Sequence, residues 1–421
     1  MLHLLPSYLC FELNDPHVLV IGFSSIIILS YLFNILSTKT NIPSVVMLIG
    51  LGILIQQVAK YFGYNLPNLQ TPLVFLGTVG VILIVLEAAL DLELSKEKWP
   101  TIWKSLVVAL LGLLISTFLI AMFFKSVMAM ETIVSYFYAI PLAVLSSAII
   151  IPSVGGLIPS QKEFMVYEST FSDILGIMLF YFMKDYATAT SAMEVATGIT
   201  GNIFITVILS IAASFGLILL IQKITSQLKL FLLIAVLLLL YAIGKKLGYS
   251  SLVLILFFGL MLNNTKLFFR GFLSRFADNK ILKNVLHDFH MITLESAFVL
   301  RTFFFVIFGV KIVLVSLVSL NVVLSSLVVA IILYVVRLAL LGLFKRKDVF
   351  PLLYIAPRGL ITIILFFAIP AKYTSPAFDS GILLFVILTT SFIMTISLIQ
   401  NGFKIKPASK EYSDGLYKIY D

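Results

Sequence analysis

Charged residues are scarce in this sequence: they make up 12% of the 421 residues, whereas hydrophobic residues make up 61%. A soluble protein carries roughly 25% charged residues, and a chain this apolar has too little polar surface to cover itself in water. The composition therefore excludes a soluble enzyme and a soluble DNA-binding protein. In a membrane protein, the net charge of +9 is typical of basic cytoplasmic loops, and it does not predict a nucleic-acid partner.

Residues that bind transition metals are equally scarce. The single cysteine, Cys10, excludes an internal disulfide framework and a cysteine-based metal cluster. The four histidines are scattered along the chain and show no metal-ligand spacing; they are His3, His17, His287 and His290. We therefore expect no cofactor and no enzymatic centre.

Long apolar runs are abundant. A membrane-spanning helix needs about 20 mostly apolar residues, and this criterion predicts thirteen spans. Their centres lie near Ile27, Leu51, Ile82, Leu114, Val144, Ile177, Ser210, Val236, Leu256, Phe304, Val328, Thr362 and Ile387. Lysine and arginine concentrate in the loops on one side, which predicts a plasma (inner) membrane protein with its amino terminus outside and its carboxyl terminus in the cytoplasm. The expected fold class is an all-α polytopic membrane protein.

Two of the predicted spans carry helix-breaking residues. The fifth span is interrupted at Ile151-Pro152-Ser-Val-Gly-Gly156 and the twelfth at Ala356-Pro357-Arg358-Gly359. Seven spans separate them, an odd number, so the two copies would have opposite orientations. Inverted repeats with two interrupted helices at matching positions indicate the substrate site of a secondary transporter. The alternative for each break is a simple proline kink.

Ionisable residues inside a membrane are costly and indicate function. Glu168 and Asp173 lie in the sixth span, and Arg301, Arg337 and Arg358 lie in later spans. Because five residues separate the two acids, they point roughly 140° apart on a helix. We expect one of them to be locked in a pair with an arginine, and the other to hold either a proton or a metal cation. Competition between the two ions would yield antiport.

Neutral oxygens that could complete a cation site stand close by in the sequence. Ser146 and Ser147 precede the break in the fifth span, and Ser172 precedes Asp173. Hydroxyl oxygens suit hard cations such as Na⁺ or K⁺, although each serine could instead bond to its own helix backbone. We expect Glu87 and Asp91, near the end of the third span, to be interfacial.

These motifs resemble the sodium/proton exchanger branch of the monovalent cation:proton antiporter superfamily. Glu168-Ser-Thr-Phe-Ser-Asp173 is similar to the Glu-Ser-Leu-Leu-Asn-Asp signature of that branch. Val336-Arg337-Leu-Ala-Leu-Leu-Gly resembles its arginine helix, and Pro357-Arg358-Gly359 resembles a segment of its broken twelfth helix. Arg301-Thr-Phe-Phe-Phe-Val-Ile-Phe-Gly309 resembles its Phe-rich tenth helix.

The resemblance implies a homodimer in which a mobile ion-translocating core moves against a dimerisation scaffold. The core would comprise the spans near residues 104–186 and 317–403, and the scaffold those near 17–90 and part of 197–313. It also implies that Asp173 carries the cation or proton and that Glu168 and Arg337 form the locked pair. Pro152, Arg358, Gly359 and Arg301 are assigned to the broken helices or to regulation.

The sequence therefore predicts a secondary active antiporter that exchanges Na⁺ or K⁺ for a proton at Asp173 and serves pH homeostasis. Ser172 stands where the electrogenic branch has a second aspartate, so exchange would be electroneutral. The triplet Ser146-Ser147-Ala148 departs from the usual Thr-Asp-Pro and leaves Na⁺ or K⁺ open. Three alternatives remain: an organic-anion symporter that uses Arg301 and Arg358, a cation channel of the same fold, and a transport-dead scaffold.

Overall fold

The computed structural model describes residues 16–40, 42–63, 70–188, 192–223, 229–246, 251–269, 279–312, 319–345 and 349–400. Within these ranges the chain is helical and contains no strand. The helices are α1 (Pro16–Thr40), α2 (Ser44–Tyr61), α3 (Gln70–Asp91), α4 (Trp99–Val127), α5 (Thr132–Ala143), α6 (Ser147–Ser153), α7 (Pro159–Thr188), α8 (Ala192–Lys223), α9 (Lys229–Lys246), α10 (Ser251–Asn263), α11 (Thr265–Phe268), α12 (Asn279–Lys311), α14 (Leu320–Phe344), α15 (Val349–Leu352), α16 (Leu360–Phe367) and α17 (Ser380–Gln400).

The hydropathy pattern locates these helices well. Each predicted span centre falls on a described helix except Val144, which lies in the gap between α5 and α6. By length and composition, seven of the described helical segments can cross a membrane, and α10 is among the shorter apolar helices. The chain is thus a multi-pass membrane protein, while the number thirteen stays a prediction.

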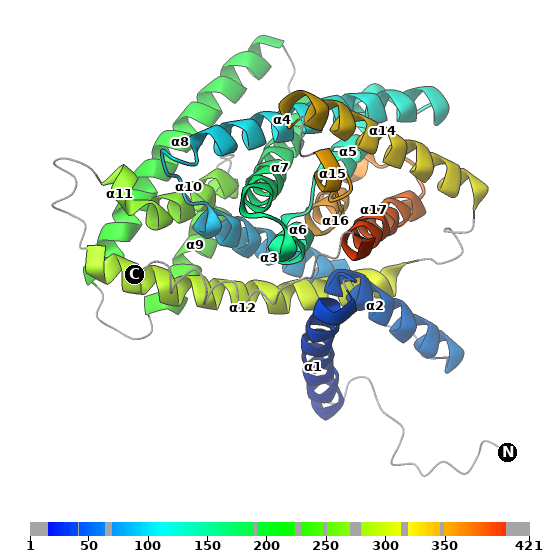
Figure 1. The fold of residues 1–421 in the computed structure, drawn as a ribbon, viewed down its shortest axis with the longest axis horizontal. Coiled ribbons are helices and arrows are strands. Elements are labelled where there is room, and N and C mark those ends of the chain that lie inside the picture. The colour runs from blue at the N-terminus through cyan, green and yellow to red at the C-terminus, as the bar shows by residue number, and fades with distance from the viewer. Residues whose placement is uncertain are drawn as a thin grey trace.

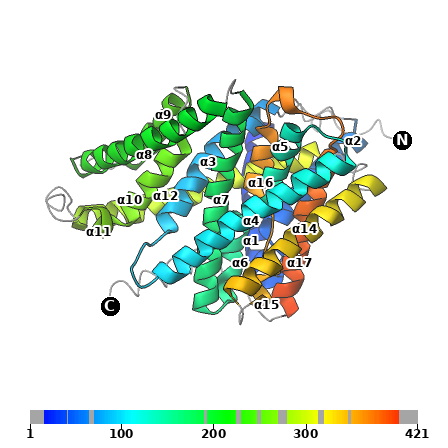
Figure 2. The same cartoon turned by 90° about the horizontal axis from the view of Figure 1, so that it is seen from above.

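The helices pack in two neighbouring groups (Figures 1 and 2). In the first group, α12 packs along α2 and α3, and α10 packs against α3, α8 and α9. In the second group, α4 packs against α5, α7 and α14, and α14 packs against α17. The short helices α6 and α16 lie in the middle of the second group, where α6 contacts α7 and α16 contacts α5 and α3. Contacts of α3 with α7 and α16 join the two groups.

The interruption of the fifth span lies earlier than the sequence predicted. We expected it at Pro152–Gly156, but α5 ends at Ala143 and α6 begins at Ser147. Pro152 instead lies inside α6, which is followed by a single 3₁₀ turn at Val154–Gly156. Proline has no N–H to donate to the carbonyl four residues earlier, and α6 ends one residue after Pro152. The second break lies where the sequence predicted it, because Pro357, Arg358 and Gly359 all fall between α15 and α16.

The longest polar stretch of the sequence, Asn263–His290, predicts a cytoplasmic loop with an amphipathic piece around Ile281–Phe289, and part of this stretch is helical instead. Residues 270–278 lie outside the described ranges, but α12 already begins at Asn279 and absorbs the expected amphipathic piece around Ile281–Phe289. Its buried positions Val285, Phe289, Thr293 and Ala297 repeat every four residues and form one continuous face. The charged residues between these positions lower the hydropathy of this first part of the helix, and for that reason the sequence predicted a loop there.

Two glycines allow α2 and α12 to approach each other at backbone distance. A methyl group added at Gly52 would meet the carbonyl oxygen of Val306 and lie 2.8 Å from Cα of Gly309. A methyl group added at Gly309 would lie 3.0 Å from Cα of Gly52. Small residues at such crossings let membrane helices gain van der Waals contact. This crossing fixes α2 on α12 within the first group.

We predict that Gly52→Ala destabilises the protein by about 1–3 kcal/mol, because the new methyl group meets backbone atoms that cannot rotate away. Gly50→Ala is the matched control on the same helix, since nothing lies within 4 Å of its added carbon. The control should be neutral or gain up to ~1 kcal/mol of helix propensity. Thermal melting in detergent compares the two, and equal melting temperatures would argue against the close crossing.

Candidate functional site

The break between α5 and α6 exposes backbone groups that a helix would have satisfied. The protein supplies a partner for each of three successive donors. The N–H of Leu145 donates to Oγ of Ser172 at 2.9 Å, and that of Ser146 donates to the carbonyl of Pro357 at 3.0 Å. The N–H of Ser147 donates to Oδ2 of Asp173 at 3.2 Å. An irregular segment at membrane depth requires such partners, and α7 together with the second break provides them.

Arg358 satisfies the carbonyl groups on the other side of the same break. Its Nε donates to the carbonyl of Leu142 at 3.1 Å and its Nη2 to that of Ala143 at 3.4 Å. Its Nη1 donates to the carbonyl of Ala356 at 2.6 Å. A cation at the carboxyl end of a helix is also favoured by the helix dipole. The buried guanidinium of Arg358 therefore joins the two interrupted helices.

Gly359 allows the two breaks to cross closely. A side-chain carbon at this position would lie 2.6 Å from Oγ of Ser146 and 2.8 Å from Cδ1 of Ile149. The backbone N–H of Gly359 donates to Oγ1 of Thr362 at 3.3 Å. Pro357, Arg358 and Gly359 of the second break therefore all contact the first break, whereas Pro152 lies inside α6.

Asp173 lies beside this crossing and is 3% exposed. Its Oδ2 accepts hydrogen bonds from both the backbone N–H and the hydroxyl of Ser147. Its Oδ1 is buried and has no hydrogen-bond partner among the described residues. The ion pairs formed by described side chains do not include Asp173. The carboxylate is therefore held in place by neutral groups and keeps one oxygen available.

The three predicted serines lie around Asp173 but differ in their contacts. Ser147 donates to the carboxylate directly. Oγ of Ser146 is buried and has no partner among the described residues. Ser172 instead uses its oxygen to accept the N–H of Leu145. Ser146 and Ser147 thus remain candidate cation ligands, whereas Ser172 supports the broken backbone.

Within the described chain, no group of three or more His, Cys, Asp or Glu side chains could hold a metal ion. Any cation at Asp173 would therefore be bound by one carboxylate and neutral oxygens. Such a ligand set carries a single negative charge, which suits a monovalent cation better than Ca²⁺ or Mg²⁺, whose sites use several carboxylates.

Glu168 and Arg337 form a two-pronged ion pair between α7 and α14. Nη1 of Arg337 lies 2.7 Å from Oε1 of Glu168, and Nη2 lies 3.1 Å from Oε2. Nε and Nη2 of Arg337 also donate to the carbonyl of Leu352 at 3.1 and 3.0 Å, at the end of α15. Both side chains are buried. Paired and hydrogen-bonded in this way, Glu168 has no oxygen free of the guanidinium, in contrast to Asp173.

Arg301 is not on a broken helix, and its assignment to regulation stays a prediction. It lies on the continuous helix α12, and its Nη1 is 3.2 Å from Oε2 of Glu87 on α3. One turn further along α3, Asp91 pairs with Nε2 of His290 at 3.0 Å. Glu87 and Asp91, expected to be interfacial, thus connect α3 to α12. The anion-symporter alternative required Arg301 and Arg358 to be available, but both guanidinium groups have partners inside the protein.

Sequence reasoning missed Thr390 of α17. Its Oγ1 accepts the backbone N–H of Arg358 at 3.1 Å and so ties α17 to the second break. A threonine in an apolar helix commonly bonds to its own backbone, and Thr390 does this as well, to the carbonyl of Val386 at 2.8 Å. The sequence therefore carries no signal that distinguishes the contact of Thr390 with Arg358 from its ordinary bond to its own helix.

The fold and site together define a class: a secondary transporter of the antiporter type, in which two interrupted helices cross beside a buried carboxylate. The sequence profile of a family described as "Sodium/hydrogen exchanger, transmembrane" matches residues 24–401. The chain belongs to this sodium/hydrogen exchanger family, and it is a cation/proton antiporter. This confirms the resemblance found in the sequence.

Solved structures show the same fold. The structure of the sodium proton antiporter MjNhaP1 from Methanocaldococcus jannaschii at pH 8 is 20% identical, with a TM-score of 0.64 over 91% of this chain and 99% of that chain. An electron-microscopy map of the same antiporter is also 20% identical, with a TM-score of 0.62 over 92% and 95% of the two chains. Among curated proteins, none matches the chain.

We predict that Glu168→Ala and Arg337→Ala each destabilise the protein by about 3–5 kcal/mol, because each leaves a buried charge without its partner. The control is Glu93→Ala, which removes a partly exposed pair with Lys98 and should cost about 0–1 kcal/mol. Melting temperatures of the purified variants give the comparison. Small and equal effects at all three positions would show that the buried pair is not a structural lock.

Proposed function

We propose that this antiporter exchanges one monovalent cation, Na⁺ or K⁺, for one proton at the carboxylate of Asp173. The observation that carries the proposal is the asymmetry of this buried side chain. One oxygen is fixed by Ser147, and the other has no hydrogen-bond partner among the described residues. A buried carboxylate is costly to leave both charged and unpaired, so the site favours an occupant, either a proton or a cation.

Competition for one carboxylate couples the two ions. A proton and a cation cannot occupy the same oxygen at once, so binding of one requires release of the other. If the empty, charged site does not cross the membrane, each crossing carries one ion, and the two directions are linked. Glu168 does not add a second exchangeable charge, because Arg337 holds both of its oxygens. The exchange would therefore be electroneutral.

The neutral ligands of the cation would be the hydroxyl oxygens of Ser146 and Ser147. Ser146 is buried at the crossing with Gly359, and its oxygen has no partner among the described residues. Ser147 already contacts the carboxylate. A hydroxyl that donates to a bare carboxylate can turn its lone pairs toward a bound cation. Ser146 directly precedes α6 and Ser147 is its first residue, so a small movement of this short helix would change the cation site.

Alternating access would require the second group of helices, α4 to α7 and α14 to α17, to move as the core. The first group, α1 to α3 and α8 to α12, would be the scaffold through which two copies form a homodimer. The core carries Asp173, the two broken helices and the pair of Glu168 with Arg337, so these would move together. In the expected orientation, in the plasma (inner) membrane, the amino terminus lies outside and the carboxyl terminus in the cytoplasm.

We predict that Asp173→Asn abolishes exchange and leaves folding intact, because the amide keeps the shape and can accept the N–H of Ser147 but has no exchangeable acidic proton and no negative charge to hold a cation. Asp185→Asn, on the same helix and exposed, is the matched control and should transport normally. Proteoliposomes with an internal pH dye, given Na⁺, K⁺ and Li⁺ in turn, provide the measurement. Cation-driven pH change above background with Asp173→Asn would remove this residue from the mechanism.

The same liposomes separate an antiporter from a channel of the same fold. With Na⁺ as the driving cation, an electroneutral exchanger moves protons at the same rate whether or not valinomycin and K⁺ clamp the membrane potential, because it moves no net charge. A channel would carry current without obligatory proton movement.

We predict that Ser147→Ala raises the apparent KM for the cation several-fold at constant pH, because it removes an oxygen ligand. Since the proton competes for Asp173, the KM of the wild type and of the variant should both rise as pH falls. Ser153→Ala is the control, because the Ser153 hydroxyl bonds only to the carbonyl of Ile149 in the described contacts. A KM that does not change with pH would contradict competition at one site.

A further inference from the structure

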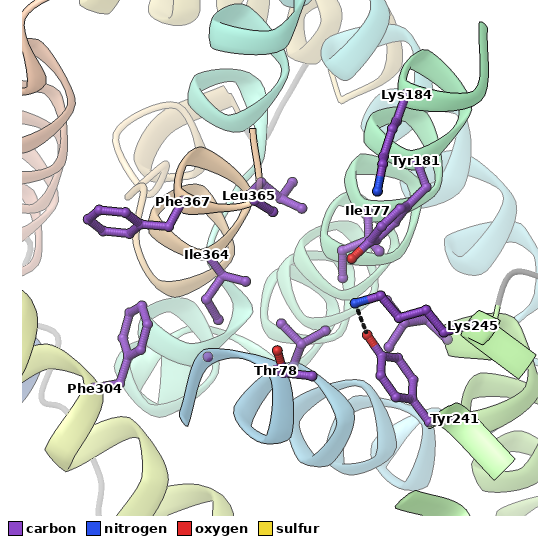
Figure 3. Close-up of a pocket in the computed structure, with 14 residues that line it drawn as sticks. Thr78, Ile177, Tyr181, Lys184, Tyr241, Lys245, Phe304, Ile364, Leu365 and Phe367 are labelled. Atoms are coloured by element: carbon purple, nitrogen blue, oxygen red, sulfur yellow. Dashed lines mark hydrogen bonds between the residues drawn. The ribbon is translucent and has the colours of Figure 1, made fainter. Parts of the chain in front are cut away.

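A second polar site lies away from Asp173, in a cavity between the two groups of helices. The cavity has a volume of about 180 Å³. Its walls come from α7 and α16 on one side and from α3, α9, α10 and α12 on the other (Figure 3). Neither Asp173 nor the serines of the crossing line it. The antiport mechanism proposed above uses none of its polar groups.

One end of this cavity is cationic. Figure 3 shows the ammonium groups of Lys184 and Lys245 directed toward the cavity, next to Tyr181 and Tyr241. Nζ of Lys245 is 3.4 Å from the hydroxyl of Tyr241 and lies 5.5 Å from the centre of its ring. No aspartate or glutamate is among the described lining residues. Asp185 interacts electrostatically with Lys184 but is exposed and does not line the cavity.

The remainder of the cavity is apolar. Ile177, Phe304, Ile364 and Phe367 are among its lining residues (Figure 3). Lys245 is exposed, so the cationic end of the cavity is accessible from outside the protein. An apolar pocket with a few polar groups at one end is the usual form of a small-molecule site.

The charge decides which kind of ligand fits. Two lysines repel Na⁺ and K⁺, so the cavity is a poor route for the transported cations. An anion would instead gain charge-assisted hydrogen bonds from the lysines and a further donor from the hydroxyl of Tyr241. From these observations we propose that the cavity binds a small organic anion, with its acidic head between Lys184 and Lys245 and its apolar body against Phe304 and Phe367.

The position of the cavity gives such a ligand a role in regulation. Ile177 follows Asp173 by one helical turn, so both lie on one stripe of α7. A ligand in the cavity would contact α7 and α16 of the core and α3 and α12 of the scaffold at once. It would therefore resist relative movement of the two groups and slow exchange. This consequence depends on the proposed function, whereas binding itself does not.

Isothermal titration of the purified full-length protein tests binding. The probe is benzenesulfonate, and the neutral benzenesulfonamide, of similar size, is the matched ligand control. We expect saturable binding of the sulfonate and none of the sulfonamide. Lys184→Met/Lys245→Met should weaken binding by roughly tenfold or more, and Lys246→Met, which changes the neighbouring exposed lysine outside the lining, should not.

The proposal is overturned if the wild type shows no saturable binding of the sulfonate or of a short-chain acidic lipid. It is also overturned if the double variant binds as well as the wild type, or if the sulfonamide binds equally. Competition by dioctanoyl phosphatidylglycerol would identify a lipid head group as a source of the anion, and its absence would identify a free anion. Should the double variant not fold, Lys245→Met alone changes only an exposed side chain and should show a smaller loss.

The effect on transport is measured in the proteoliposomes described above. Benzenesulfonate stays charged and carries no proton across the membrane, so it does not itself collapse the pH gradient. It should slow exchange by the wild type and not by the double variant. Binding without slowing would overturn the regulatory role. Asp173→Asn should still bind the sulfonate, so failure of the transport proposal is distinguishable from failure of the anion site.

Discussion

Hydrogen bonding of interrupted backbone inside the membrane is the constraint on which this structure depends. An unsatisfied N–H or carbonyl group in a hydrocarbon environment costs several kcal/mol. At the crossing, Arg358 takes the carbonyls that end α5, and Ser172, Pro357 and Asp173 take the donors that begin α6. Because Asp173 is one of these partners, the proposed ion site cannot change without affecting the broken helix. This direct contact gives ion binding a route to conformational change.

Glu168 and Asp173 of α7 both carry a carboxylate, and they differ in the groups that contact it. Glu168 faces α14 and is fixed by Arg337, whereas Asp173 faces α6 and contacts neutral groups alone. The five-residue spacing makes this separation possible, because it directs the side chains to different neighbours. The ion pair joins α7, α14 and α15 beside a carboxylate that keeps an open oxygen. A rigid core around an exchangeable site is what alternating access requires.

Hydropathy and motif spacing predicted much of the fold and part of the candidate site. They placed the helices and the second break, and the cost of buried charge predicted that one acid of the sixth span pairs with an arginine. The resemblance to the exchanger family then indicated Glu168 and Arg337 as that pair. They placed the first break too late, since the chain leaves the helix at Val144–Ser146, where the backbone N–H groups of Leu145, Ser146 and Ser147 bond to other elements. The contact of Arg301 with Glu87 spans 214 positions in the chain, and no local pattern encodes it.

Proton release on cation binding tests the central claim most directly. Purified protein in weakly buffered detergent is titrated with NaCl or KCl, and a pH indicator follows protons set free, with choline chloride as the ionic-strength control. The account predicts saturable release of close to one proton for each cation bound, in the wild type and in Asp185→Asn, and none in Asp173→Asn. Cation binding without proton release, or release that persists in Asp173→Asn, would contradict exchange at this carboxylate.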